Sequence, residues 1–249
     1  MKKQPSKGFV LTELLVAGLL SAFLMLGLIQ MAAGASRGLL LIESLSQTQQ
    51  GGRFAIQQVR EVVMPAGFRP SPWLGGSAVT GLVSGSGDGG PGGNDVLVVD
   101  QYSDLNCYGN TNGTLGSDGR PAFYLKQSKL EVTSSGNLAH TCHYGPDDGV
   151  MVRQINRQGL VSGVDSFQVL YAEDTDGNRL ANRQVRAGHW ADQANVVGIQ
   201  VGLLVSTEKS LTNQPSQTFT VLDQSLSTAN DGKLRQVWTA TIPLFSRLR

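Results

Sequence analysis

The N-terminal part of the chain carries a long, uninterrupted apolar run. Residues 14–29 (LLVAGLLSAFLMLGLI) include no charged side chain and one polar residue, Ser21. Extended back to Phe9, the run would form a helix of about 31 Å, which is long enough to cross a bilayer. The lysines nearest to the run, at positions 2, 3 and 7, all lie on its N-terminal side. We therefore expect the N-terminus to stay cytoplasmic and the rest of the chain to face the periplasm or the exterior.

A pattern with helical spacing follows this run. Seven positions at alternating spacings of three and four, five of them apolar, are Ile42, Leu45, Gln49, Gly52, Ile56, Val59 and Val63. Such a stripe predicts an amphipathic helix that lies on a core, and Pro65 and Gly67 predict where it stops. We therefore expect one long helix over residues 9–64, with glycines such as the pair Gly51-Gly52 as points where it could bend.

Beyond Pro65 the pattern changes to that of β-strands separated by turn dipeptides such as Asp176-Gly177. The expected strands are 95–100, 122–126, 129–133, 166–172, 196–206, 218–222 and 235–245. One long helix followed by these strands predicts an α+β fold, in which a β-rich globular domain over residues 65–249 packs an antiparallel sheet on the helix. The glycine-rich segment 84–94 is expected to be a flexible surface loop.

The composition indicates a body that is rich in loops. Charged residues make up 16% of the chain, and 31 of its 249 residues are glycine. The net charge of +1 argues against a nucleic-acid-binding surface over the whole molecule. Cys107 and Cys142 are its two cysteines; in an exported protein they predict one disulfide, with two buried free thiols as the alternative.

The apolar run allows three interpretations. A secretory signal peptide would be cut at a small-x-small site, which residues 33–35 (AGA) provide, and a plain membrane anchor would not be cut. Neither explains Glu13, because a carboxylate inside an apolar block costs free energy and usually marks a function. Glu13 lies four residues after Phe9, which directly follows the small residue Gly8.

The third interpretation comes from a resemblance. Residues 7–13 (KGFVLTE) resemble the start of type IV prepilins, in which a short basic leader ends in Gly and is followed by Phe, apolar residues and a Glu at the fifth mature position. The resemblance implies a leader over residues 1–8, cleaved between Gly8 and Phe9, and methylation of the new amine of Phe9. It also implies a transmembrane helix over residues 9–29 and a role for Glu13 in subunit assembly.

Residues 49–55 (QQGGRFA) are similar to a region of the PilW minor-pilin family, and looser similarity covers residues 195–201 and 232–237. The resemblance implies a pilin-like fold and a structural role as a minor pilin that helps to initiate or cap a type IV pilus. Implied partners are the prepilin peptidase, other minor pilins, the major pilin and the inner-membrane assembly platform. The implied location is the inner membrane, with a periplasmic C-terminal domain, and then the pilus at the cell surface, where twitching motility and adhesion would follow.

Other motifs are weaker. Asp174, Asp176 and Asn178 place oxygen atoms at alternate positions, which suits calcium, but the segment lacks the glycine and glutamate of an EF-hand loop. A hairpin turn is the preferred interpretation there, and weak calcium binding is the alternative. Residues 140–143 (HTCH) do not complete a zinc set. No activated nucleophile or carboxylate pair stands out, so we expect no catalytic residue, cofactor or functional metal.

Two other functions stay open at this point. A minor pseudopilin of a type II secretion system would share the leader. A membrane-anchored binding module or adhesin would keep its helix in the membrane and hold a ligand in the glycine-rich loop or at the Asp174 turn.

Overall fold

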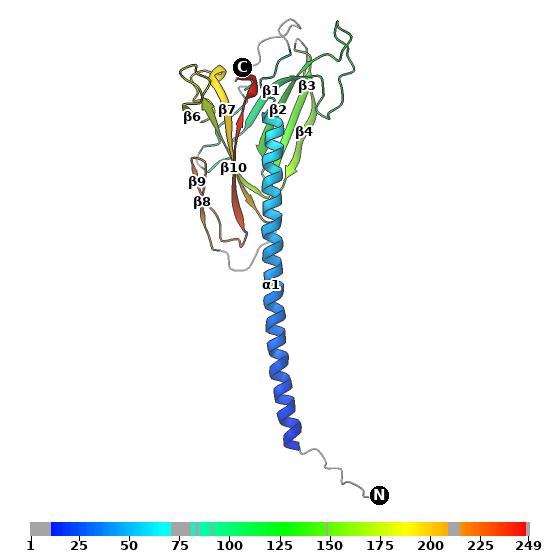
Figure 1. The fold of residues 1–249 in the computed structure, drawn as a ribbon, viewed down its shortest axis with the longest axis vertical. Helices are drawn as coiled ribbons and strands as arrows, with labels where there is room; N and C mark the ends of the chain where they lie inside the picture. Colours follow the sequence, from blue (N-terminus) through cyan, green and yellow to red (C-terminus); the bar gives the residue numbers. More distant parts are fainter. Residues whose placement is uncertain are drawn as a thin grey trace. The chain divides into compact units, whose positions relative to one another are not determined.

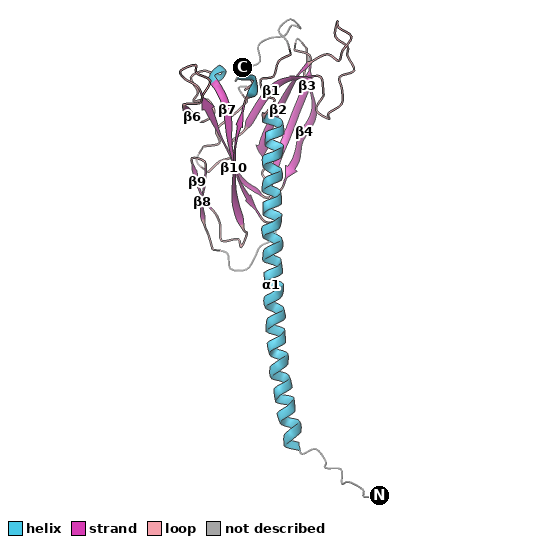
Figure 2. Ribbon diagram, viewed as in Figure 1, coloured by secondary structure: helices cyan, strands magenta, loops and turns pink. Residues whose placement is uncertain are grey.

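The structure, a computed structural model, describes residues 11–70, 81–82, 85–90, 92–147, 149–208 and 215–247. One long helix, α1 (Leu11–Val63), precedes all the strands (Figure 1, Figure 2). The strands are β1 (Leu97–Ser103), β2 (Tyr124–Val132), β3 (Leu138–Gly145), β4 (Val152–Val161), β5 (Val164–Glu173), β6 (Arg183–Val185), β7 (Val196–Ser206), β8 (Thr218–Val221), β9 (Gln224–Ser227) and β10 (Arg235–Pro243). Short 3-10 helices are η2 (Gln193–Asn195) and η3 (Phe245–Arg247). The chain divides into two compact units, residues 1–45 and 46–249, and α1 contributes to both.

Helix α1 runs for 53 residues and stays helical through all of its glycines. Leucine, alanine, methionine and glutamine, which are good helix formers, dominate its sequence. The helix ends at Val63, and Gly67 then takes a φ of +74°, a left-handed conformation that glycine adopts without strain. The predicted stop near Pro65 and Gly67 is thus confirmed.

The strands form two four-stranded sheets and one hairpin, all antiparallel. The first sheet has the order β1-β2-β3-β4, the second has the order β10-β7-β5-β6, and β8 pairs with β9 alone. The α+β fold, with a long N-terminal helix and antiparallel sheets, is confirmed. Where we expected a single sheet, however, the body has two, because the chain starts a new sheet at β5.

The strand predictions were accurate for β7 and close for β1, β5, β8 and β10. The segments 122–126 and 129–133, predicted as two strands, form the single strand β2, because polar residues between them keep the alternation of a half-buried strand. Four strands, β3, β4, β6 and β9, were missed. Strand β4 (VRQINRQGLV) is largely exposed, so it carries no apolar alternation that would reveal it.

One hydrophobic core joins α1 to both sheets. Ala55, Val59 and Val63 of α1 are completely buried in it, together with Leu130 of β2 and Phe167 of β5. The second half of the predicted apolar stripe is therefore confirmed. Its first two positions are not buried: Ile42 is 64% exposed and Leu45 is 44% exposed, since they precede the part of α1 that enters this core.

Two contacts join the C-terminal part of the chain to α1 and to the segment that follows it. The indole of Trp238 on β10 packs so tightly on Gly52 of α1 that a Cβ atom at Gly52 would lie 2.1 Å from the indole Nε1. Farther along, the Ser246 hydroxyl donates a hydrogen bond of 2.7 Å to the main-chain oxygen of Ala66, which is 180 positions earlier in the chain. The last strand and its extension thus complete the packing of the helix.

The described part of the glycine-rich segment lies against the sheets, contrary to the expected flexible surface loop. Asn94 accepts a hydrogen bond of 2.7 Å from the Phe167 main-chain N–H. The buried Asp95 carboxylate accepts hydrogen bonds from the N–H groups of Gly89 and Val169, at 2.9 and 2.7 Å. Side chains therefore satisfy backbone groups of β5 that no neighbouring strand reaches, as buried polar groups require.

Candidate functional site

The first feature with functional meaning is the exposed apolar surface of α1 before residue 45. Between residues 11 and 42 most of its large apolar side chains are more than half exposed, for example Phe23 at 80% and Met31 at 75%. Its most apolar window has a mean hydropathy of 2.2, and no part of that window is buried. By length and composition this helix can cross a membrane. Apolar surface of this extent needs lipid or other apolar chains as its surroundings.

Glu13 lies in the first described turn of α1, within this apolar surface. Its neighbours Leu11, Leu14 and Leu15 are 78%, 68% and 60% exposed, so the carboxylate stands among side chains that favour a lipid environment. Glu13 is thus a polar side chain within a largely apolar turn, and its role in subunit assembly stays a prediction. The predicted cleavage residues Gly8 and Phe9 lie outside the described residues.

The two cysteines are joined, as predicted. Cys107 and Cys142 form a disulfide with their Cα atoms 6.0 Å apart and 35 positions between them in the chain. The bond ties the long connection between β1 and β2 to the buried strand β3. In the chain-entropy model a closed loop of this length stabilises the fold by about 4 kcal/mol.

The Asp174 segment forms the turn between β5 and β6. The Asp174 carboxylate accepts hydrogen bonds from the N–H groups of Asp176, Gly177 and Arg179, the last at 2.6 Å. The Asp176 carboxylate accepts hydrogen bonds from both the main-chain N–H and the side-chain amide of Asn178. Burial raises the pKa of Asp174, but these hydrogen bonds outweigh it, and the pKa is lowered overall. The oxygen atoms considered for calcium thus already organise the turn.

Two other segments of the sequence contain residue types that are common in catalytic or metal sites. Residues 34–38 (GASRG) match the G-x-S-x-G pattern of a hydrolase nucleophile elbow, which requires a turn between a strand and a helix. Ser36 instead lies inside α1 and donates a hydrogen bond to the main-chain oxygen of Ala32. His140 lies on β3, where burial and the nearby Lys126 ammonium lower its pKa to about 4, so its ring is neutral at pH 7. Cys142 is engaged in the disulfide. Among the described residues, no group of three or more His, Cys, Asp or Glu side chains could hold a metal ion.

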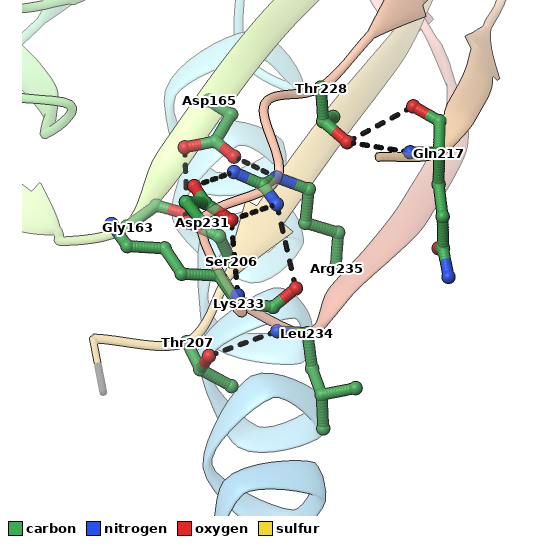
Figure 3. Close-up of polar contacts among 10 residues, drawn as sticks. All are labelled: Gly163, Asp165, Ser206, Thr207, Gln217, Thr228, Asp231, Lys233, Leu234 and Arg235. Atoms are coloured by element: carbon green, nitrogen blue, oxygen red, sulfur yellow. Dashed lines mark hydrogen bonds and ion pairs between the residues drawn. The ribbon is translucent and has the colours of Figure 1, made fainter. Parts of the chain in front are cut away.

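A polar cluster around Arg235 fixes one end of the second sheet (Figure 3). The Arg235 side chain, 8% exposed, donates to Asp165 of β5 at 2.6 Å and makes two hydrogen bonds to Asp231 at 2.8 and 2.5 Å. Ser206 at the end of β7 donates to the same Asp165 carboxylate at 3.0 Å. Bidentate pairs of this kind are among the stronger ion pairs in proteins. The hydrogen bonds from Arg235 hold the pKa of Asp231 well below its usual range.

Neither this cluster nor the contact between Trp238 and Gly52 is predicted by the sequence pattern. Arg235 lies in the segment 232–237, which was recognised only by resemblance. Gly52 was taken as a weak point of the helix, whereas its position inside the apolar stripe was the available signal. A glycine that replaces an apolar residue in such a stripe indicates that another group approaches the helix closely.

Comparison with known proteins agrees with these features. Residues 141–246, which include the Arg235 cluster, Trp238 and the whole second sheet, match the family model PilW, described as Type IV Pilus-assembly protein W. A search of curated proteins gives no match. Among solved structures, a type IV-like pilin from Thermus thermophilus is similar over 84% of this chain and 97% of its own, with 16% identity and a TM-score of 0.47. The sequence of residues 141–246 is therefore similar to the PilW family of type IV pilus-assembly proteins.

Proposed function

We propose that this protein is a minor pilin, a structural and non-enzymatic subunit that helps to initiate or cap a type IV pilus. The observation that carries the proposal is the exposed apolar half of α1, with Glu13 in its first described turn, in a chain that is also similar to the PilW family over residues 141–246. An apolar helix that is exposed over this length can lie in the membrane before assembly. It can then be covered by the helices of neighbouring subunits in a filament.

The proposal includes processing at the N-terminus. Prepilin peptidase would cut between Gly8 and Phe9 on the cytoplasmic side, and the new amine of Phe9 would be methylated. The protein would stay in the inner membrane through α1, with its β-rich body in the periplasm, until the assembly platform adds it to the filament. Mass spectrometry of the native protein should then show residues 1–8 missing and a methyl group on Phe9. A mature N-terminus at Ser36 would instead indicate ordinary signal peptidase and contradict the proposal.

Glu13 gives this assembly a physical basis. Cleavage would leave a positively charged amine on Phe9, and an ionised group in the apolar part of a bilayer costs free energy, less near its edge than the roughly 2.5–3.5 kcal/mol at its centre. An amine from one subunit and a carboxylate from the next would relieve each other's cost and fix the axial register of the packed helices. A helix that remained a lone anchor would gain nothing from carrying the carboxylate.

The test replaces Glu13 by valine and by aspartate. Glu13→Val should leave the Gly8–Phe9 cut intact but reduce co-purification of other pilins and the number of pili per cell. Glu13→Asp, which keeps the charge on a shorter side chain, should be intermediate. Glu43→Val is the matched control, since Glu43 is an exposed carboxylate of the same helix beyond the predicted transmembrane segment. Normal assembly by Glu13→Val, or an equal loss with Glu43→Val, would contradict the role proposed for Glu13.

A further inference from the structure

A pocket of about 330 Å³ lies between the connection that follows β1 and the adjoining ends of β2, β3 and β4. Tyr124 and Tyr144 contribute to its lining, and their rings lie 5.5 Å apart at an interplanar angle of 39°. Val150 and Val152 contribute at its outer side, and they are 84% and 59% exposed. Pockets of this size, lined by aromatic side chains and a few polar groups, are typical small-molecule sites.

The wall formed by the β1–β2 connection is held rigidly. The disulfide fixes Cys107, whose N–H donates a hydrogen bond of 2.9 Å to the Gln154 side-chain oxygen. The Tyr108 hydroxyl also donates to the main-chain oxygen of Gln154. Asn112 donates a hydrogen bond of 2.8 Å to the main-chain oxygen of Ala122. A wall that is already ordered loses little conformational entropy when a ligand binds.

Several polar groups of the lining are not used within the protein. In the part of the chain that the structure describes, the hydroxyls of Tyr124 and Thr111 and the side-chain amide nitrogen of Gln154 make no hydrogen bond. They come from three separate segments around the tyrosine rings. A purely apolar ligand would cover these groups without pairing them, at a cost for each group.

The charges of the pocket favour a neutral ligand. None of its lining residues carries a formal charge. Burial raises the pKa of Tyr144 to about 12, with a smaller contribution from the nearby Asp104 carboxylate, so the Tyr144 hydroxyl stays neutral. A charged ligand would lose its hydration here without gaining an ion pair from a residue of the lining.

We propose that this pocket binds a neutral sugar residue. A pyranose ring has an apolar C–H face and a rim of hydroxyls. The C–H face matches the electron-rich ring of the half-buried Tyr124, which the buried Tyr144 backs from within the protein. The rim matches the unused hydroxyl and amide groups of the pocket. The proposal concerns recognition by the body of the protein and does not depend on how α1 assembles.

The experiment uses the purified full chain in detergent and ligand-observed NMR with glucose, galactose, N-acetylglucosamine and N-acetylgalactosamine at millimolar concentration. Glucuronic acid serves as the anionic control, and acetylated, amidated trivaline as the peptide control. We expect at least one neutral sugar to bind, with saturation transfer strongest at its ring C–H groups, and glucuronic acid to bind more weakly. No binding by any neutral sugar, or equal binding of the anionic sugar, would overturn the proposal, as would preferential binding of the peptide.

Variants locate the site. Tyr124→Ala removes a ring of the pocket, and Gln154→Glu keeps the oxygen that holds Cys107 but replaces the free amide by a charge. Each should weaken sugar binding by about tenfold or more. Leu180→Lys is the matched control, because Leu180 is 70% exposed and lies outside the pocket. Thermal unfolding and the intact disulfide confirm that each variant is folded. Undiminished binding by both pocket variants would refute the assignment.

Discussion

Replacing Gly52 by alanine should destabilise the body of the protein, although alanine is the better helix former. A Cβ atom at this position would lie 2.1 Å from Nε1 and 2.3 Å from Cε2 of the Trp238 indole. Non-bonded heavy atoms prefer separations of about 3.5–4.0 Å, so helix and indole would have to separate by more than 1 Å, on the order of a bond length. Trp238 cannot withdraw alone, because β10 is paired with β7 along its whole length.

The magnitude follows from two opposing effects. Alanine in place of glycine within a helix gains about 0.5–1 kcal/mol. Overpacking a tight contact costs about 1–3 kcal/mol. For Gly52→Ala the overpacking should prevail, and the two ranges give a net loss of up to about 2.5 kcal/mol in the free energy of unfolding. Gly51 is the matched control, since a Cβ there would meet its nearest neighbour, Val205, only at 3.9 Å. Gly51→Ala should therefore stabilise by about 0.5–1 kcal/mol.

Thermal unfolding of the full chain in detergent, followed by near-ultraviolet circular dichroism, should separate the two variants. For a protein of this size, 1 kcal/mol corresponds to about 2–4 °C in Tm, so Gly52→Ala should melt lower than the wild type and Gly51→Ala higher. In a Trp238→Leu background the cost of Gly52→Ala should shrink, because the indole is gone. If Gly52→Ala were as stabilising as Gly51→Ala, the packing of α1 on Trp238 would be wrong.

Three further predictions concern the body. Breaking the disulfide by Cys107→Ser with Cys142→Ser should lower the free energy of unfolding by about 4 kcal/mol in denaturant titrations, and an unchanged value would mean that the bond closes no loop of the unfolded chain. Burial raises the pKa of Asp100 from 3.8 to about 6, so the folded state prefers the protonated carboxyl. This stabilisation is complete below about pH 4 and is lost as the pH rises through 6. Asp100→Asn should therefore flatten the pH dependence of the free energy of unfolding and stabilise the protein at pH 7.5 by at most about 3 kcal/mol. If the free energy of unfolding changed with pH equally in variant and wild type, the prediction would be wrong. Millimolar calcium should leave Tm unchanged, because the Asp174 carboxylate is already engaged with main-chain N–H groups, and a rise of several degrees would reveal a site there.

The sequence predicted those parts of the fold in which apolar residues recur with a clear helical or strand spacing, or in which proline or glycine ends a helix. The apolar run, the stop near Pro65 and the long buried strand β7 each leave such a signal in a few neighbouring residues. Strand β4 leaves none, because it is an edge strand with mostly polar, exposed side chains. The division into two sheets is also invisible locally, since it depends on which strands pair across the chain.

In the candidate site, too, only the features with a local sequence signal were predicted. Glu13 was found because a carboxylate in an apolar run is conspicuous, and the disulfide because the chain has only two cysteines. The Arg235 cluster joins Asp165, Ser206 and Asp231 over a separation of up to 70 residues, so no short motif contains it. No short motif contains the contact of Asp95 either, because its carboxylate accepts a hydrogen bond from the distant Val169 main-chain N–H. This contact holds the glycine-rich segment against the body.

The hydrogen bond from Ser246 to Ala66 also joins two residues that are synthesised at very different times. At about 5–20 residues per second, a ribosome needs roughly 10 to 40 s to make the 180 residues that separate the two partners. During that interval Ala55, Val59 and Val63 have been synthesised, whereas Trp238 and Leu244, which pack in the same core, have not. The amphipathic half of α1 is therefore without its own domain for many seconds, and a cell that makes this protein has to shield that face until the last strand arrives.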